Sequence, residues 1–510
     1  MLLATGDQIR KADQVMIEEL DFPGVLLMEE AGRKAANFIL DTCPDHSRFL
    51  VLAGPGNNGG DGFVIARYLM RWGKSVQIIL SHAPDRYAGD AGINLKALNG
   101  SRILVRIWPE HPGIDDETVL IDALLGTGIN SEIRGVILEM VHSFAAHQGP
   151  VIAIDMPSGL LADTGKVLSK PLKADYTLTF QLPKICHAVY PAANFCGTTC
   201  VADIGIWNSV IGDLGINRHW MDGQEARDIL KHHPRPVEGH KGTFGHVALI
   251  GGSNQYPGAI ALSGHAALHA GAGLSTVIGT EHCRTAIFGM GPEVIFRAVS
   301  GERINRTHLD AVLEWTSGCT IGIGPGWSTH PEVKEFFLTF LEKTDRPLVL
   351  DADALNLIAF EQCWDLIPPK SVITPHPGEI KRLLRSDQGS DQRLEQAEQL
   401  AKDKNLVVVL KGAGTVVASP NKTWVNTSGN SGMGTGGSGD VLTGVITSLL
   451  AQGHQPASAA ALGVYLHGLA GDLATQKFGA PGLTASRIME HLGPAMVTII
   501  ERQEPQITTI

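Results

Sequence analysis

The chain has 510 residues, too many for a single hydrophobic core, so at least two domains are expected. It is 44% hydrophobic and 18% charged with 59 glycines, a composition typical of loop-rich α/β proteins and not of disordered ones. The formal net charge of -11, with no run of Lys or Arg, argues against nucleic acid as a partner.

The N-terminal segment MLLATGDQIRKADQ lacks the charged, apolar and small-residue regions of a signal peptide, and no apolar run is long enough to span a bilayer. The seven cysteines are scattered without a CxxC pair, which is typical of reduced thiols. We therefore expect a soluble, cytoplasmic protein with no membrane partner. Helices rich in Ala and Gly, such as 459–474, favour close subunit packing, and a homo-oligomer is expected.

The first 80 residues predict the opening of a nucleotide-binding βαβ unit. Two helices within residues 7–40 precede an apolar strand at 49–53, the loop GPGNNGGDG and a helix at 63–71. The next strand does not end in an acidic residue, so the dinucleotide fingerprint is weak. Asn57, Asn58 and Asp61 add side-chain oxygens that suit a hard cation with a sugar or phosphate. A tight turn capped by Asn and Asp is the alternative.

Two further strands end in polar loops. Strand 119–123 carries Asp122 at its end and leads to a Gly-Thr-Gly loop, and strand 151–154 leads to Asp155 and Ser158. Because the carboxyl ends of parallel strands meet at one edge of a sheet, these loops predict one shared site. An isolated aspartate at such a position is more often a cap.

The motifs GNNGGDG, IDALLGTG and AIDMPSG, in this order, resemble the NAD(P)H-hydrate epimerase family. The resemblance implies a Rossmann-like domain that inverts C6 of a hydrated nicotinamide ring, with K+ held by Asn58, Asp122 and Ser158. Asp155 is the expected acid/base residue. Lys184 is a candidate partner, although a surface lysine is the commoner interpretation. The implied substrate-binding residues are Asn57, Asn58, Gly59, Gly60, Asp61, Gly126, Thr127, Gly128, Ile129, Asn130, Ser131, Glu132 and Asp155.

Residues 221–245 are polar and contain Pro and His without periodicity, apart from a short helix at 224–231. We place a domain boundary here, which gives domains 1–221 and 222–510. In the second domain, strand-and-helix units alternate, and a hairpin around KGAGT comes late in the order. This pattern predicts a ribokinase-like, three-layer α/β/α domain.

The stretch 426–446 is a glycine-rich polar loop that leads into an apolar helix with Asp440 in its first turn. Free N–H groups and the helix dipole make such a turn an anion site. A carboxylate beside bound phosphate suggests a base that takes a proton from a hydroxyl as phosphate arrives. A flexible linker followed by a helix with an Asp N-cap is the alternative.

The motif set GGSNQYPGA, GPGWS, DADALN, TPHPGE, KGAGT and GGSGD resembles the ADP-dependent NAD(P)H-hydrate dehydratase family. The whole chain is thus similar to the bifunctional NAD(P)H-hydrate repair enzymes. The resemblance implies conversion of NADHX or NADPHX, the hydrated cofactors, to NAD(P)H, with ADP as co-substrate and Mg2+ on its phosphates. The implied residues are Ala259, Gly326, His376 and Asp440 for the hydrated dinucleotide, and Lys411, Gly412, Ala413, Gly414, Thr415 and Gly439 for the nucleotide.

A ribokinase-like kinase acting on a vitamin precursor, fused to a nucleotide-sensing module, would use the same glycine loop and the same aspartate. The attached first half and the pair DADALN and TPHPGE favour the repair enzyme. The sequence leaves open the preference between NADHX and NADPHX and the use of ATP in place of ADP.

Overall fold

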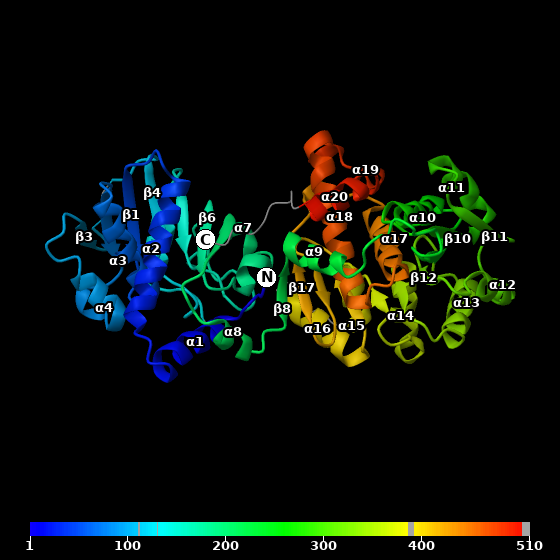
Figure 1. Ribbon diagram of the computed structural model, residues 1–510, viewed down its shortest axis with the longest axis horizontal. Coiled ribbons are helices and arrows are strands. Elements are labelled where there is room, and N and C mark those ends of the chain that lie inside the picture. Colours follow the sequence, from blue (N-terminus) through cyan, green and yellow to red (C-terminus); the bar gives the residue numbers. More distant parts are fainter. Residues whose placement is uncertain (111–112, 130, 386–391, 502–510) are drawn as a thin grey trace. The chain divides into compact units, whose positions relative to one another are not determined.

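The computed structural model describes residues 1–110, 113–129, 131–385 and 392–501. The chain divides into two compact units (Figure 1): an N-terminal unit, Leu2–Arg218, and a C-terminal unit made of Met1 and the residues from His219 onward. The expected boundary near residue 222 falls just after the short strand β8, Arg218–Met221.

The N-terminal unit is built on seven strands: β1 Arg48–Ala53, β2 Ser75–Leu80, β3 Leu104–Ile107, β4 Thr118–Ala123, β5 Val151–Ile154, β6 Tyr176–Phe180 and β7 Thr198–Ala202. Its helices are α1 Gly6–Gln14, α2 Gly24–Thr42, α3 Asn57–Arg71, α4 Gly89–Lys96, α5 Val136–Phe144, α6 Ile185–Ala188, α7 Ala193–Cys196 and α8 Asn208–Asp213, with a π-turn η1 at Val15–Glu19 and a 3-10 turn η2 at Pro84–Arg86.

The strands of this unit form one sheet in the order β3-β2-β1-β4-β5-β6-β7, and the described pairs are parallel. Alternate strand residues face opposite sides. One side packs on α2 and α3, and the other packs on α5. Because the chain continues from β1 to β2 on one side and returns to β4 on the other, the loops after β1 and β4 flank a switch point, where α/β proteins bind ligands.

One sequence expectation about this unit is wrong. The GNNGGDG segment was expected to be a loop followed by a helix from residue 63, but α3 already begins at Asn57. Glycine is required there by close packing: a Cβ on Gly59 would clash with the carbonyl oxygen of Gly54, and one on Gly60 would lie 2.6 Å from the Met28 sulfur. The glycines thus let the first turn of α3 approach its neighbours.

The C-terminal unit contains ten strands: β8 Arg218–Met221, β9 His246–Ile250, β10 Leu274–Thr280, β11 Ile295–Val299, β12 Thr320–Ile323, β13 Leu348–Leu350, β14 Val372–Ile373, β15 Val407–Leu410, β16 Val416–Ala418 and β17 Thr423–Asn426. Its α-helices are α9 Gly223–Lys231, α10 Pro257–His269, α11 Arg284–Met290, α12 Leu309–Trp315, α13 Pro331–Glu342, α14 Asp353–Glu361, α15 Pro377–Leu384, α16 Arg393–Lys404, α17 Ser438–Ala451, α18 Pro456–Phe478, α19 Ala485–Glu490 and α20 Leu492–Glu501. Short 3-10 turns lie at Glu281–Cys283, Arg306–His308, Trp364–Leu366, Ser431–Met433 and Ala480–Gly482.

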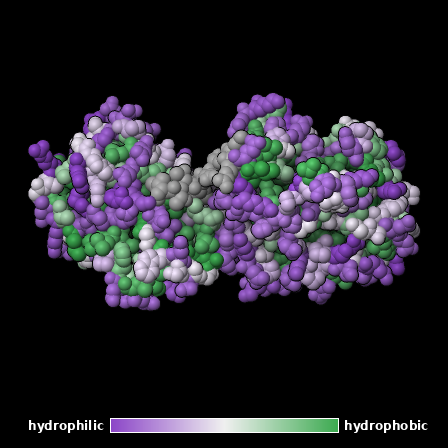
Figure 2. Space-filling view, in the orientation of Figure 1, coloured by the Kyte–Doolittle hydropathy of each residue, from purple (hydrophilic) through white to green (hydrophobic). Residues whose placement is uncertain are grey.

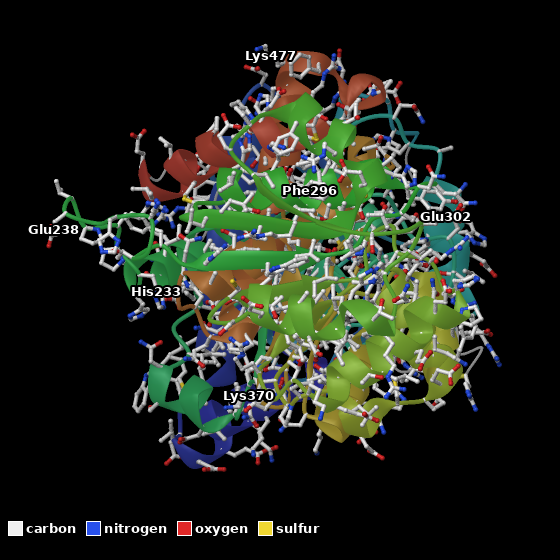
Figure 3. All side chains as sticks on the ribbon, turned by 90° about the vertical axis from the view of Figure 1, so that its right-hand side faces the viewer. His233, Glu238, Phe296, Glu302, Lys370 and Lys477 are labelled. Atoms are coloured by element: carbon white, nitrogen blue, oxygen red, sulfur yellow. The ribbon has the colours of Figure 1, made fainter. Side chains whose placement is uncertain are left out.

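The sheet order of this unit is β11-β10-β9-β12-β13-β14-β15-β16-β17-β8. The strands from β11 to β15 pair in parallel, and β15, β16 and β17 pair antiparallel, which confirms the predicted hairpin around KGAGT. Helices α10, α17 and α18 cover one face, and α13 to α16 lie on the other (Figure 1). In the end-on view of Figure 3, Phe296 marks the edge strand β11, with helices on both sides. The predicted α/β class with three-layer units is confirmed.

Hydrophilic residues cover most of the face shown in Figure 2, and hydrophobic residues appear there in small patches. Within the described part of the chain, the helices are all too short or too polar to cross a bilayer.

Gly59→Ala tests whether this close packing fixes the start of α3. We expect it to lower the free energy of unfolding by about 2 kcal/mol, because the methyl group displaces the backbone of Gly54. Gly56→Ala is the control, since nothing lies within 4 Å of its Cβ position. Chemical denaturation measures both variants, and equal stability of the two would contradict the explanation.

Candidate active sites

A cavity of about 480 Å³ lies at the carboxyl ends of the strands around the switch point of the N-terminal unit. Its walls come from α1, from the start of α3, from the loop after β4 and from Asp155, directly after β5. The three loops that the sequence predicted to share a site therefore meet at this cavity.

Asp122 and Ser158 accept hydrogen bonds from the backbone of the loop after β4, which lines the cavity. The Asp122 carboxylate is fully buried and accepts hydrogen bonds from the Ser158 hydroxyl (2.7 Å) and N–H (2.8 Å) and from the Leu124 N–H (3.2 Å). Burial raises the pKa of Asp122, and these hydrogen bonds oppose the rise. Asn58 is 8% exposed, yet its side-chain oxygen and nitrogen have no hydrogen-bond partner. The unpartnered Asn58 amide, the Asp122 carboxylate and the Ser158 hydroxyl carry oxygen atoms of the kind that suit a hard cation.

Asp155 is held in an unusual backbone conformation beside a buried lysine. Its φ of 65° lies in the left-handed region, which a non-glycine residue adopts only where its surroundings compensate. Its Oδ1 accepts hydrogen bonds from Lys184 Nζ (2.5 Å) and the Thr179 hydroxyl (3.1 Å). Burial disfavours the charged form of Asp155, but the Lys184 ammonium outweighs it, so that the pKa is lowered. The Lys184 side chain is 1% exposed, so the expectation of a surface lysine is wrong.

Two more carboxyl groups line the same cavity. Asp61 is almost completely buried, and burial raises its pKa well above the usual value, with the charges of Asp155 and Asp13 adding to the effect. Asp13, on α1, was not identified from the sequence because it lies in no recognisable motif. Burial raises the pKa of Asp13 to about 6, opposed by Lys184 and supported by Asp155.

The other predicted residues of this unit fall into two groups. The loop residues Gly126, Thr127, Gly128 and Ile129, with Asn57, line the cavity. Gly59 and Gly60 are buried inside α3, and the side chain of Glu132 is exposed and paired with Arg134. Ser131 is exposed, and Asn130 lies outside the described residues.

In the C-terminal unit, Asp440 lies in the first turn of α17, as the sequence predicted. The turn is preceded by Gly437 with φ 88°, and its backbone is anchored on α10 because the Ser263 hydroxyl donates to the Asp440 carbonyl (2.8 Å). Burial raises the pKa of Asp440 to about 7; Asp351 and Asp353 add to the rise and Lys411 opposes it. This carboxyl group can therefore take up a proton near neutral pH.

Lys411 interacts electrostatically with Asp440 and belongs to a buried network of charged groups. Its ammonium contacts Asp351 Oδ1 at 2.8 Å and Glu379 at 4.0 Å. Asp351, 1% exposed, also accepts hydrogen bonds from the hydroxyls of Thr374 and Thr443, each at 2.7 Å. Burial opposes ionisation of both partners, but their mutual attraction lowers the pKa of Asp351 and raises that of Lys411. Thr443 lies on α17, so Asp351 joins the lysine to the helix that carries Asp440.

Sequence reasoning missed the role of Asp351. It is the first residue of the DADALN motif, but its partners come from β14, β15 and α17, and only the sheet order brings these together. The motif was a usable signal, because an acidic residue directly after a buried parallel strand lies at the ligand-binding edge.

The other predicted residues of this unit come from α10, the loop after β12, the N-cap of α15 and the start of α17. Ala259 is on α10, and a Cβ on Gly326, where φ is 64°, would lie 3.0 Å from the Ala259 Cβ. The Ser263 hydroxyl contacts both the Ala259 carbonyl (3.2 Å) and Asp440. The His376 side chain caps α15 by accepting a hydrogen bond from the Gly378 N–H (2.9 Å). Burial lowers the pKa of His376, which favours its neutral form. Gly439 lies so close to Lys411 that a Cβ would be 3.4 Å from Nζ.

The KGAGT turn is fixed by a single arginine. Arg393, on α16, donates to the carbonyls of Ala413 (3.0 Å), Leu410 (3.1 Å) and Lys411 (3.0 Å). The Thr415 hydroxyl closes the turn onto the Gly412 carbonyl at 2.8 Å. Gly414 has φ 58°, a conformation that glycine adopts without strain.

Comparisons with known proteins identify the family. A family model described as YjeF-related protein N-terminus matches residues 25–186, and one described as NAD(P)H-hydrate dehydratase matches residues 247–493. A bifunctional NAD(P)H-hydrate repair enzyme of Moorella thermoacetica is 36% identical and aligns over 99% of this chain and 98% of its own. The chain belongs to the family of bifunctional NAD(P)H-hydrate repair enzymes. This confirms the resemblance found in the motifs.

Further similar proteins include a second repair enzyme and two solved structures. The repair enzyme of Escherichia coli is 34% identical over 96% of this chain and 92% of its own. Among solved structures, an ADP/ATP-dependent NAD(P)H-hydrate dehydratase of Bacillus subtilis, co-crystallised with ATP and Mg2+, is 28% identical, covers 55% of this chain and 98% of its own, and has a TM-score of 0.47. A ribokinase-like superfamily protein of Enterococcus faecalis is 28% identical over 56% of this chain and 96% of its own, with a TM-score of 0.48.

Asp351→Asn tests the buried network of this family member. The variant leaves the Lys411 ammonium buried without its carboxylate, and we expect the free energy of unfolding to fall by about 3 kcal/mol. The exposed Asp345→Asn is the matched control. Chemical denaturation at neutral pH compares the two, and a loss no greater than that of the control would show that the ion pair is not structural.

Proposed function

We propose that the chain repairs hydrated nicotinamide cofactors at two active sites, one in each unit. The N-terminal unit interconverts the R and S forms of NADHX and NADPHX, and the C-terminal unit dehydrates the S form with ADP. The observation that carries this proposal is full-length similarity to proteins named bifunctional NAD(P)H-hydrate repair enzymes, over 99% of the chain. The geometry of the two sites supports it.

In the N-terminal unit, Asp155 is the proposed base for the C6 hydroxyl of the hydrated ring. Its Oδ1 is occupied by Lys184 and Thr179, while Oδ2 lies toward the Gly126 loop, 3.0 Å from where a Gly126 Cβ would be. The pKa of Asp155 is lowered, so the residue is ionised and ready to accept a proton at neutral pH. The cavity residues Asn57, Asn58 and Asp61 and the loop Gly126 to Ile129 would bind the dinucleotide.

We assign the potassium ion to the loops at this cavity. Asn58, Asp122 and Ser158 supply only oxygen donors for it, and the unpartnered amide of Asn58 is the observation that a cation would explain. When bound, the ion would supply positive charge that offsets the carboxylates and attracts an anionic substrate.

In the C-terminal unit, Asp440 is the proposed base of the dehydration. It would take the proton of the C6 hydroxyl as the oxygen attacks the β-phosphate of ADP, which makes phosphate a leaving group in place of hydroxide. Free N–H groups at the start of α17 would stabilise the charge on the transferring phosphoryl group. The attack breaks the bond between the β-phosphorus and AMP, so AMP is released as the phosphate ester forms. The N1 lone pair then expels phosphate, and loss of a proton from C5 restores the reduced ring.

Nucleotide binding in this unit is assigned to the KGAGT turn, Lys411 to Thr415, with Gly439. Ala259, Gly326 and His376 would bind the hydrated dinucleotide. Mg2+ would be carried by the nucleotide phosphates, because among the described residues there is no cluster of three or more His, Cys, Asp or Glu side chains suited to a metal. The kinase alternative would use Asp440 in the same way, but relatives named as repair enzymes span both units, so it is not favoured.

Two variants separate the activities. Asp155→Asn should lower the rate of epimerisation by about 100-fold or more while dehydration of the S form persists, and Asp440→Asn should do the reverse. Chromatographic separation of the two isomers measures epimerisation without ADP, and the absorbance of the reduced nicotinamide measures dehydration. Each variant is the folding control for the other, and loss of both activities in one folded variant would contradict separate sites.

The dehydration should depend on pH through Asp440. Its pKa of about 7 means that the carboxylate needed as a base is lost as the pH falls below 7, so kcat/KM should decrease toward acidic pH and level off above about pH 8. A profile of initial rates with ADP and the S form measures this. A rate that stays constant from pH 8 down to pH 5 would rule out Asp440 as the base.

A further inference from the structure

The cavity of the N-terminal unit is lined by an acidic side chain, Asp13, to which the proposed chemistry gives no role. Asp13 lies on α1, outside the residues 25–186 matched by the family model. Helix α1 is firmly attached to the site: the Arg10 guanidinium donates to the Thr127 carbonyl (2.7 Å), and the Ala4 N–H donates to the Pro183 carbonyl (2.9 Å), next to Lys184. Asp13 is therefore held in the cavity wall with the residues assigned to the substrate.

Epimerisation at C6 requires an acid as well as a base. The C6 hydroxyl and the ring nitrogen N1 share one carbon, so inversion can proceed by opening the C6–N1 bond. The base removes the hydroxyl proton, the O–H electron pair forms the aldehyde C=O, and the C6–N1 electron pair moves to N1, which takes a proton from the acid. Closure on the other face of the aldehyde reverses both transfers, so no further reactant is consumed.

The geometry excludes Lys184 and His187 as the acid that gives a proton to the ring nitrogen N1. The Lys184 ammonium has three N–H groups, and they are directed to Asp155 Oδ1 (2.5 Å), the Thr179 hydroxyl (2.7 Å) and the Phe180 carbonyl (3.2 Å). Both ring nitrogens of His187 are engaged, one by the Lys184 N–H (2.9 Å) and the other with the Asp155 carbonyl (3.0 Å). Burial lowers the pKa of His187 to about 3, so it is neutral.

Asp61 and Asp13 remain as acids that line the cavity near the ion pair. Asp61 is deeply buried, and burial raises its pKa well above the usual value, which favours its protonated form. Asp13 is half-buried, and its pKa of about 6 is close to the working pH, as efficient proton exchange requires. The charged groups around Asp13 are Arg10 on its own helix, Lys184, Asp155, Asp61 and Asp90 on the facing walls.

We propose that Asp13 is a second catalytic residue of the N-terminal unit, which exchanges a proton with the ring nitrogen while Asp155 exchanges the proton of the C6 hydroxyl. The inference rests on the proposed epimerisation. The active form has Asp13 protonated and Asp155 ionised, so the epimerisation rate falls as the pH rises through about 6.

Asp13→Asn tests this in the full chain, with pure S-NADHX as substrate and ADP omitted so that dehydration does not occur. The isomers are separated chromatographically after short incubations between pH 5 and 9, and the spontaneous rate is subtracted. We expect kcat to fall by about 100-fold with KM unchanged, and the decline above pH 6 to disappear. Asp41→Asn, an exposed aspartate on α2, is the matched control and should retain the wild-type rate and profile.

A wild-type rate in Asp13→Asn, or a reduced rate that still declines above pH 6, would overturn the assignment of Asp13 and leave the proposed function intact. A KM raised together with the loss of kcat would show that Asp13 shapes the cavity and does not exchange a proton. Absence of epimerisation in the unsubstituted chain would overturn the proposed function itself, and the assignment of Asp13 with it.

Discussion

Each unit depends on one buried lysine placed among several carboxyl groups. Lys184 contacts Asp155 in the N-terminal unit, and Lys411 contacts Asp351 in the C-terminal unit. A buried ammonium is costly unless it is paired, and the pairing fixes which carboxylate stays charged. The pKa of each paired aspartate is lowered, whereas burial and the negative charge of that aspartate raise the pKa values of the unpaired acids nearby. The same arrangement thus places an ionised carboxylate and a carboxyl group that can exchange a proton within a single site.

Parallel sheets make this arrangement possible because they bring strand ends together. In the N-terminal unit Asp122 lies at the end of β4 and Asp155 follows the neighbouring strand β5, and in the C-terminal unit Asp351 follows β13. Each fold then adds its cation from another element: Lys184 precedes α6, and Lys411 follows β15. The two sites differ in chemistry because a different helix lies beside each of them. In the N-terminal unit α1 forms part of the cavity wall, while in the C-terminal unit α17 carries Asp440 in its first turn.

The features that lie within one motif could be predicted from the sequence. The α/β class, the late hairpin, Asp440 in the first turn of a buried helix and the polar strand ends at Asp122 and Asp155 follow from hydrophobic periodicity and glycine patterns. The start of α3 could not be predicted, because glycine-rich segments favour loops locally and only tight packing against Gly54 and Met28 makes this one helical. Lys184 and Asp13 lie in no motif, and their burial arises from elements that are distant in the chain.

The most direct test of the account starts from the pure R form of NADHX, incubated with ADP, Mg2+ and the full chain while the absorbance of the reduced nicotinamide is followed. The account predicts complete recovery of NADH, faster than the spontaneous epimerisation allows, because the N-terminal unit supplies the S form that the C-terminal unit dehydrates. Recovery no faster than spontaneous epimerisation, or none with ADP, would contradict the claim that both units are active in cofactor repair.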